Sequence, residues 1–228
     1  MNHIPVVTID GPSSAGKGTI AKMLCIDLNW HILDSGALYR TLALILEEKK
    51  LDLANFSLEK KNIMKEFNVS FNPGEIGEPV KVILQGKDIT RKIRTEKIAL
   101  KSSIIAASSE VREFIRPCQR DFLKSPGLIA DGRDMGTVIF PDADLKIFLT
   151  ASIQERAKRR QSQLKRQGSR VNMRVLLKEL KARDKKDMDR EHSPLRPAED
   201  SYVVDTSKMK PKEVIKEVKK LPFDFLNK

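Results

Sequence analysis

The sequence predicts an α/β fold in which a parallel sheet of about five strands is flanked by helices. Two observations carry this prediction. Short apolar runs alternate with longer segments of helical periodicity along most of the chain. These runs are continuously apolar rather than alternating, which is typical of strands that are buried on both faces. A glycine-rich stretch after the first run adds a third indication.

The first predicted strand covers residues 4–9 and ends at an Asp-Gly pair, and a helix follows over residues 15–28. A second strand at 30–33 and a helix at 38–48 repeat the unit. The later elements continue the alternation, with strands predicted at 128–130, 145–149 and 202–204 and helices at 110–123, 153–167, 173–187 and 212–221. Pro117 stands inside one of these helical patterns, so we expect a kink or a break there.

Residues 69–93 interrupt this alternation with shorter strand-like stretches separated by Asn-Pro-Gly and Gly-Glu-Pro turn signals. We predict a small antiparallel insert of two or three strands between the second and third core strands. The chain of 228 residues suits one domain over its whole length.

Composition excludes several classes of protein. Cys25 and Cys118 are the two cysteines and stand far apart, which argues against a disulfide framework or a zinc site and favours the reducing cytoplasm. No secretory signal and no membrane-spanning apolar run is visible. The net charge is +12, yet aromatic residues make up only 5% and no basic-aromatic platform occurs. We therefore expect neither a nucleic-acid nor a membrane partner, and a monomer.

The stretch from Gly11 to Lys17 matches the pattern G-x-x-x-x-G-K between a predicted strand and a predicted helix. In such loops backbone N–H groups and the helix N-terminus bind phosphates, and the lysine reaches the terminal ones. Gly18 stands where many such loops carry Ser or Thr, so position 18 offers no side chain to Mg²⁺, and the hydroxyl comes at Thr19. The predicted phosphate-binding residues are Gly11, Ser13, Ser14, Ala15, Gly16, Lys17, Gly18 and Thr19.

Four further segments carry arginines in suggestive positions. Two of them, 34–40 and 130–136, follow predicted strands and so are expected at the carboxyl edge of the sheet, where folds of this kind bind ligands. The other two are helical, with basic and acidic residues spaced to share a face: Arg156, Arg159 and Arg160 in one, and Arg183, Asp187 and Arg190 in the other. Together with a phosphate loop, this pattern indicates a second, anionic ligand and hence phosphoryl transfer from ATP.

At this level of detail the chain resembles the bacterial cytidylate kinases, which phosphorylate CMP and dCMP from ATP. The resemblance covers nearly the whole chain, through TIDGPSSAGKGT, LDSGALYR, IADGRDMGTVIFPDADLKIFL, RDKKDMDR and SPLRPAED. The block around Arg133 is the most specific of these, whereas the phosphate loop alone is not specific.

The resemblance implies a region that binds the acceptor nucleotide at about residues 35–125, including the insert at 69–93, and a lid at about 156–170. It also implies roles at the matching positions. The acceptor nucleotide would bind Ser35, Arg40, Ser103, Arg112, Arg133, Asp134, Arg183, Asp187 and Arg190. The electrostatic catalysts would be Lys17, Arg133, Arg156 and Arg160, with Mg²⁺ bridging the phosphates of ATP and no resident metal site. Two alternatives stay open at this point: the same fold acting on UMP, shikimate or dephospho-coenzyme A, and a basic nucleic-acid-binding protein with a nucleotide site.

Overall fold

The computed structural model describes residues 3–75, 77–166, 168 and 171–227. Its centre is a five-stranded sheet in the order β2-β6-β1-β7-β8, and every neighbouring pair of strands is parallel. This confirms the predicted sheet. The strands are β1 (Val6–Asp10), β2 (His31–Asp34), β6 (Leu128–Asp131), β7 (Leu145–Thr150) and β8 (Tyr202–Asp205).

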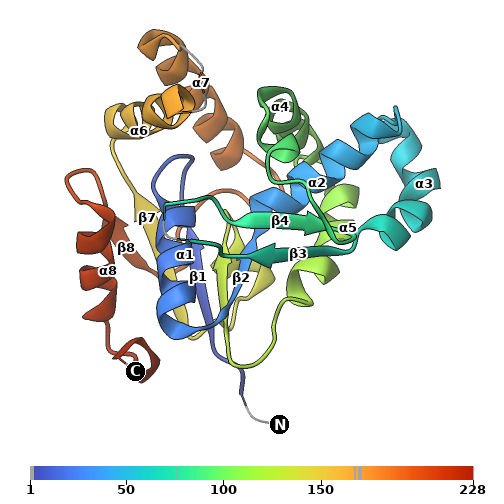
Figure 1. The fold of residues 1–228 in the computed structure, drawn as a ribbon. Coiled ribbons are helices and arrows are strands. Elements are labelled where there is room, and N and C mark those ends of the chain that lie inside the picture. Colours follow the sequence, from blue (N-terminus) through green and yellow to red (C-terminus); the bar gives the residue numbers. More distant parts are fainter. Residues whose placement is uncertain (1–2, 76, 167, 169–170, 228) are drawn as a thin grey trace.

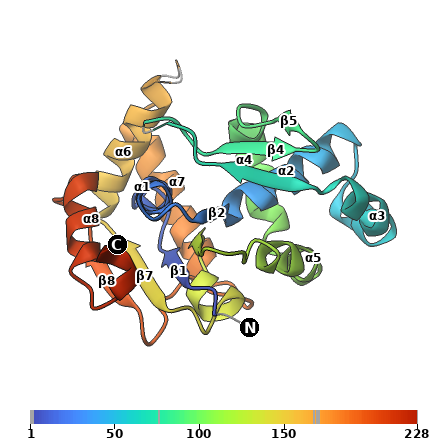
Figure 2. The same cartoon turned by 60° about the horizontal axis from the view of Figure 1, so that its bottom comes forward.

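Helices cover both faces of the sheet because its central strands carry apolar side chains on both sides. Val7 and Ile9 of β1 belong to an apolar core shared with α1 (Lys17–Leu28) and α8 (Pro211–Lys219). Val6 of the same strand faces the opposite core, shared with α2 (Ser35–Glu48) and α5 (Ser109–Arg120). Figures 1 and 2 show the two helical layers with the sheet between them.

The carboxyl ends of three strands meet at one edge of the sheet. In the strand register Asp131 at the end of β6 lies opposite both Ile9 of β1 and Asp34 of β2. The connections that follow these strands therefore start side by side, beneath the hairpin formed by α6 (Ile153–Arg166) and α7 (Met173–Met188), as Figure 1 shows. Ligands of doubly wound sheets bind at such an edge.

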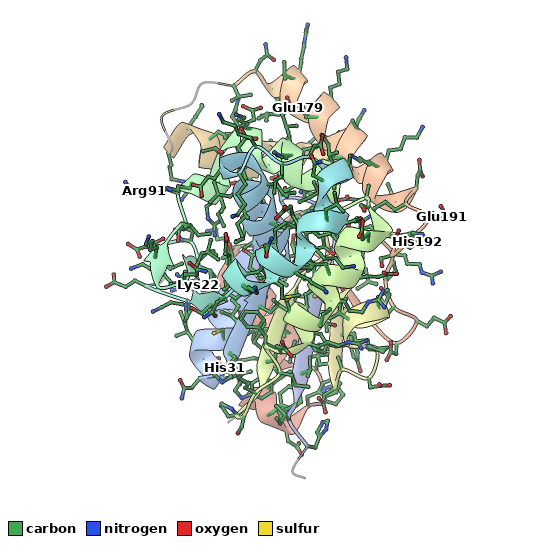
Figure 3. The ribbon with its side chains drawn as sticks, turned by 90° about the vertical axis from the view of Figure 1, so that its right-hand side faces the viewer. Lys22, His31, Arg91, Glu179, Glu191 and His192 are labelled. Carbon is green, nitrogen blue, oxygen red and sulfur yellow. The ribbon has the colours of Figure 1, made fainter. Side chains whose placement is uncertain are left out.

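The predicted insert forms a separate antiparallel sheet of three strands, β3 (Val69–Asn72), β4 (Lys81–Leu84) and β5 (Lys87–Asp88), in that order. Residue 76 of the predicted insert lies outside the described residues. The loop between β3 and β4 is tied to α1, because Lys22 Nζ donates to the carbonyl oxygen of Glu78 at 2.7 Å and to that of Glu75. Lys22 lies beside this insert in Figure 3.

Two helices occur where none is predicted, α3 (Leu53–Glu66) and α4 (Glu96–Ile105). Both begin at a capping side chain: Asp52 accepts from the backbone N–H of Asn55 and Thr95 from that of Ile98. Of the kink or break predicted at Pro117, the break is wrong, since α5 continues through this residue to Arg120. The proline has no N–H to donate, so it removes one backbone hydrogen bond, and the rest of the helix continues past it.

Part of the predicted helix that starts at 153 and part of the expected lid lie outside the described residues. Residue 167, the predicted end of the helix that starts at 153, lies outside the described residues, as do 169 and 170 of the expected lid.

No helix in the described part of the chain has a stretch both long and apolar enough to cross a membrane.

Candidate active site

The loop after β1 has the curled backbone that phosphate binding requires. Gly11, Ser14 and Gly16 all have positive φ angles. At Gly11, where φ is 142°, a Cβ atom would lie 2.0 Å from the carbonyl oxygen of Leu149, so only glycine fits against β7 there. All eight predicted phosphate-binding residues fall within this loop and the first turn of α1.

The N-terminus of α1 is left open toward the loop. Gly16 is the N-cap, no side chain caps the helix there, and its first turn contains no acidic residue. The first backbone N–H groups and the positive end of the helix dipole are thus available to an anion. Lys17 is buried beside them, with Nζ donating to the carbonyl oxygen of Pro12 at 3.1 Å. Burial, and then the nearby Arg133, lower the pKa of Lys17 below its ordinary value.

Asp131 accounts for the glycine at position 18. A Cβ atom on Gly18 would lie 3.1 Å from Oδ2 of Asp131, so a larger side chain at position 18 would crowd that carboxylate. Burial raises the pKa of Asp131, while the adjacent Lys17 opposes that shift. The Asp131 carboxylate therefore lies beside position 18, where other loops of this type carry Ser or Thr.

The residues around this carboxylate fit a magnesium ion that is held mainly by its nucleotide. In the described residues no group of three or more His, Cys, Asp or Glu side chains is placed to hold a metal ion. Mg²⁺ prefers oxygen ligands, keeps several waters, and commonly takes one or two carboxylates plus substrate phosphates. Asp131 is the carboxylate that fits this description.

A cavity of about 210 Å³ opens next to Lys17 between α2, α4, α5 and α7. All nine predicted acceptor-binding residues line it, although they come from five separate parts of the chain. Those residues are Ser35, Arg40, Ser103, Arg112, Arg133, Asp134, Arg183, Asp187 and Arg190.

One end of the cavity is organised by a buried ion pair. Arg112 Nη2 donates to Oδ2 of Asp134, and both side chains are less than a tenth exposed. The same guanidinium donates through Nη1 to the carbonyl oxygen of Ala106 at 3.2 Å and lies 5.8 Å from the ring centroid of Tyr39. Three contacts hold Arg112 in place, so this end presents a fixed pattern of donors and acceptors.

Arg133 connects the cavity to the phosphate loop. Its Nε donates to Oδ2 of Asp187 at 3.0 Å, and its Nη2 donates to Oγ of Ser13 at 2.8 Å. Burial alone would raise the pKa of Asp187, but the charge and hydrogen bond of Arg133 hold it below its usual range. Arg133 therefore stands between the two sites that a donor and an acceptor would occupy.

Positive charge exceeds negative charge around the cavity. Eight Lys and Arg side chains line it against four Asp side chains. Burial, together with Arg133, lowers the pKa of Arg183 to about 10, which leaves it cationic at neutral pH. Nε of Arg183, Nη2 of Arg190 and Nε of Arg94 are buried without a hydrogen-bond partner among the described residues. Such groups are costly unless an anion completes them, so the cavity is suited to a phosphorylated ligand.

The predicted lid arginines differ in what they contact. Arg156 is buried and donates to the carbonyl oxygens of Ala151 at 3.0 Å and Ser13 at 3.2 Å, while its Nη2 lies 2.7 Å from Oδ2 of Asp184. Arg160 is half-buried and donates to Oε1 of Gln163 at 3.0 Å. Neither lines the cavity.

Arg159, which the sequence placed on the same helix face, holds the phosphate loop from outside. It donates to the carbonyl oxygen of Ala15 at 3.0 Å and to Oγ1 of Thr206 at 2.9 Å. Arg156 and Arg159 thus both donate hydrogen bonds to backbone carbonyl oxygens of the phosphate loop in this structure.

Sequence reasoning did not nominate several residues that line this cavity, among them Tyr39, Arg94, Asp131 and Lys186. Tyr39 and Asp131 stand inside segments that were already singled out, next to nominated residues, and a strand-terminal Asp beside a phosphate loop is a usable signal. Arg94 lines the cavity from a 3₁₀ turn without a recognisable motif, whereas Lys186 lines it from α7 and stands inside the quoted segment RDKKDMDR, next to the nominated Asp187.

Comparison with known proteins is consistent with this arrangement. The profile of the cytidylate kinase family matches residues 7–222. A cytidylate kinase of Pseudomonas entomophila is 46% identical over 218 residues, which covers 96% of this chain and 95% of the relative. A cytidylate kinase of Shewanella putrefaciens is 48% identical over 223 residues, which covers 98% and 95%.

A solved structure, TT1252 from Thermus thermophilus, covers 97% of this chain and 100% of its own, with 18% identity and a TM-score of 0.47. That likeness is too distant to bear on function. The family match and the two relatives extend over nearly the whole chain, and on these grounds the chain belongs to the cytidylate kinase family.

Proposed function

We propose that this protein transfers the γ-phosphoryl group of ATP to CMP or dCMP, giving ADP and CDP or dCDP. The observation that carries the proposal is the cavity lined by Arg133 and the other arginines, which opens beside Lys17 of the phosphate loop. ATP would occupy the loop and the acceptor the cavity, so that the two phosphates meet between Lys17 and Arg133. Phosphoryl transfer depends mainly on such positioning and on neutralising phosphate oxygens.

The two ends of the cavity take different parts of the acceptor. The arginines near the phosphate loop, Arg40, Arg133 and Arg183, bind the phosphate, since guanidinium groups pair with phosphate oxygens through two N–H groups. Ser103, Arg112 and Asp134 read the base, because a hydroxyl and a carboxylate accept from the exocyclic amine of cytosine. Asp187 and Arg190 complete the site beside Arg133.

The reaction needs no general base, because a phosphate monoester is already ionised near pH 7. Lys17 and Arg133 stabilise the charge on the transferring group, and Arg156 and Arg160 act from the lid. Mg²⁺ supplies further charge neutralisation when bound with ATP, with Asp131 as the nearby carboxylate. In this proposal the lid spans about residues 156–170 and the acceptor-binding region about 35–125, and lid closure excludes water that would otherwise accept the phosphoryl group.

We further propose that the protein works as a monomer in the cytoplasm. Two features support this. Cys25 and Cys118 are both free thiols, as is usual in a reducing compartment. Large apolar side chains that are exposed in the described part of the chain, such as Ile26, Leu58 and Val175, come from separate helices and form no long apolar stripe on any one of them.

An acceptor screen tests the proposal. ATP and Mg²⁺ are supplied with CMP, dCMP, UMP or AMP in turn, and nucleoside diphosphate is measured by chromatography. CMP and dCMP are expected to be phosphorylated with clearly higher kcat/KM than the others. Preference for AMP or UMP contradicts the assignment of the base-reading residues, and absence of any diphosphate contradicts the proposed reaction.

A further inference from the structure

Gln119 lies outside the cavity but contacts a residue that lines it. Its side chain is fully buried on α5, and Nε2 donates to Oγ of Ser35 at 2.8 Å, across 84 positions of sequence. Ser35 is the first residue of α2 and lines the cavity. The contact therefore links the back of the site to a hydroxyl at its surface.

This hydrogen bond decides which way the Ser35 hydroxyl acts. A serine hydroxyl has one hydrogen to donate and two lone pairs that accept. The N–H of Gln119 occupies a lone pair, and within the described residues the Ser35 hydroxyl donates to no acceptor. Its hydrogen is therefore left for an oxygen that enters the cavity.

The carbonyl half of the Gln119 amide indicates that the N–H half is the reason for having an amide at this position. Oε1 is buried and has no hydrogen-bond partner in the described part of the chain. In this orientation Oε1 and the second N–H of Gln119 are left without a partner among the described residues, whereas turning the amide over would leave both N–H groups without one. An apolar side chain of similar size would avoid the stranded oxygen altogether, so the feature that favours an amide here is its donor bond to Ser35.

The backbone around Gln119 keeps that donor still. The guanidinium of Arg120, the next residue, donates through Nε to the carbonyl oxygen of Ile139 at 3.1 Å. This ties the end of α5 to the turn that follows the Arg133 segment. Phe114 and Ile115 of the same helix are buried in the apolar core. Gln119 thus cannot follow the Ser35 hydroxyl if it rotates.

We propose that Gln119 is a positioning residue that fixes Ser35 as a hydrogen-bond donor to an oxygen of the acceptor nucleotide. The proposal rests on the proposed function, because it takes the cavity to be the acceptor site. Gln119 does not touch the nucleotide itself, but it determines that the Ser35 hydroxyl, which does touch it, acts as a hydrogen-bond donor. Replacing the donor by an acceptor at position 119 would reverse the Ser35 hydroxyl and turn a lone pair toward the nucleotide.

Two substitutions of similar size separate this role from packing. Gln119→Met removes the donor and leaves Ser35 free to rotate, whereas Gln119→Glu offers a carboxylate that accepts the Ser35 hydrogen. Above the pKa of that carboxyl group we expect Gln119→Glu to raise KM for CMP roughly ten-fold or more, and Gln119→Met to raise it less. KM for ATP stays within about two-fold, because the phosphate loop is untouched.

The pH profile gives a readout that a packing defect would not produce. Lowering the pH protonates the introduced glutamate, restores a donor, and brings KM for CMP in Gln119→Glu back toward that of the wild type assayed at the same pH. The same series in a Ser35→Ala background is the control, since Gln119 acts only through Ser35. There, neither substitution should change KM for CMP further.

Two results would overturn the inference: equal effects of the Gln119 substitutions with and without Ser35, or parallel rises in KM for CMP and ATP. Thermal unfolding of every variant is followed as well, and if Gln119→Glu does not fold, Gln119→Met in the two backgrounds still decides the matter. A wild type that does not phosphorylate CMP would contradict the proposed function instead, so the two failures are distinguishable.

Discussion

The donor and acceptor halves of this site are built in opposite ways. The phosphate loop is one continuous stretch from Gly11 to Thr19 that works through backbone N–H groups, a helix terminus and a single lysine. The nine nominated residues of the acceptor cavity come from five separate segments, with ion pairs such as Arg112–Asp134 and Arg133–Asp187 between them. Local backbone geometry determines the first, and long-range packing determines the second.

This difference has consequences for mutation. Substitutions in the loop should change catalysis with little effect on the acceptor, because the backbone groups that bind phosphate remain. Substitutions of the paired cavity residues Arg112, Asp134, Arg133 and Asp187 should affect stability and acceptor binding together, since each removes one member of an ion pair that is largely buried. Arg133 belongs to both halves through Ser13 and Asp187.

The largest effect is expected from Lys17→Ala. Loss of the ammonium group removes charge stabilisation from the transferring phosphoryl group, and kcat should fall on the order of 10³-fold. CMP binding, measured by calorimetry, should change only a few-fold, because Lys17 contributes one of eight cations around the cavity. A kcat within a few-fold of wild type would show that the loop does not supply the catalytic charge.

Asp134→Asn should mainly cost stability. It leaves the Arg112 guanidinium buried without its counter-charge, and the free energy of unfolding should drop by about 3 kcal/mol. Urea denaturation measures this, and activity with CMP should fall as well because the base end of the cavity is disturbed.

Combining Asp134→Asn with Arg112→Met sharpens the test. The double variant removes both charges and should regain much of the lost stability, but not the activity with CMP. Asp187→Asn is a milder control, because Arg133 and Asp187 are more exposed and Arg133 keeps its bond to Ser13. Full recovery of activity in the double variant would argue against a role for this pair in binding the acceptor.

The smallest expected effect is a pH dependence on the donor side. Burial lowers the pKa of Lys17 in the free protein, whereas the polyphosphate of ATP favours the protonated amine. As pH rises through the lowered pKa the free protein loses the ammonium charge, so ATP binding must take up a proton and kcat/KM for ATP should fall by up to about ten-fold per pH unit. The decline should begin below the pH at which an exposed lysine titrates.

Lys17→Arg is the matched variant for that measurement. A guanidinium stays charged over the whole range, so its profile should be flat there even though its activity is lower. A decline in Lys17→Arg as steep as in the wild type would assign the pH dependence to another group.

Much of the fold was predictable because its signals are local. Apolar runs mark the five strands, and the phosphate loop and Gly18 can be read directly from residues 11–19. Helices α3 and α4 were missed because their stability comes from packing: Phe56 and Ile63 of α3 and Ile98 and Ile105 of α4 are the buried positions in otherwise polar or weakly patterned segments. Residues such as Arg94 and Gln119 carry no local pattern of their own.

The sequence by itself determined the five core strands, most of the helices, the phosphate loop and the family resemblance, because these depend on residue type and short-range spacing. Only the tertiary structure decided that nine acceptor residues line one cavity, that Asp131 occupies the space beside Gly18, and that Arg156 is committed to Ser13 and Asp184. It also revealed the contact from Gln119 to Ser35. Such contacts join residues that are dozens of positions apart, and they exist only once the sheet brings the carboxyl ends of its strands together.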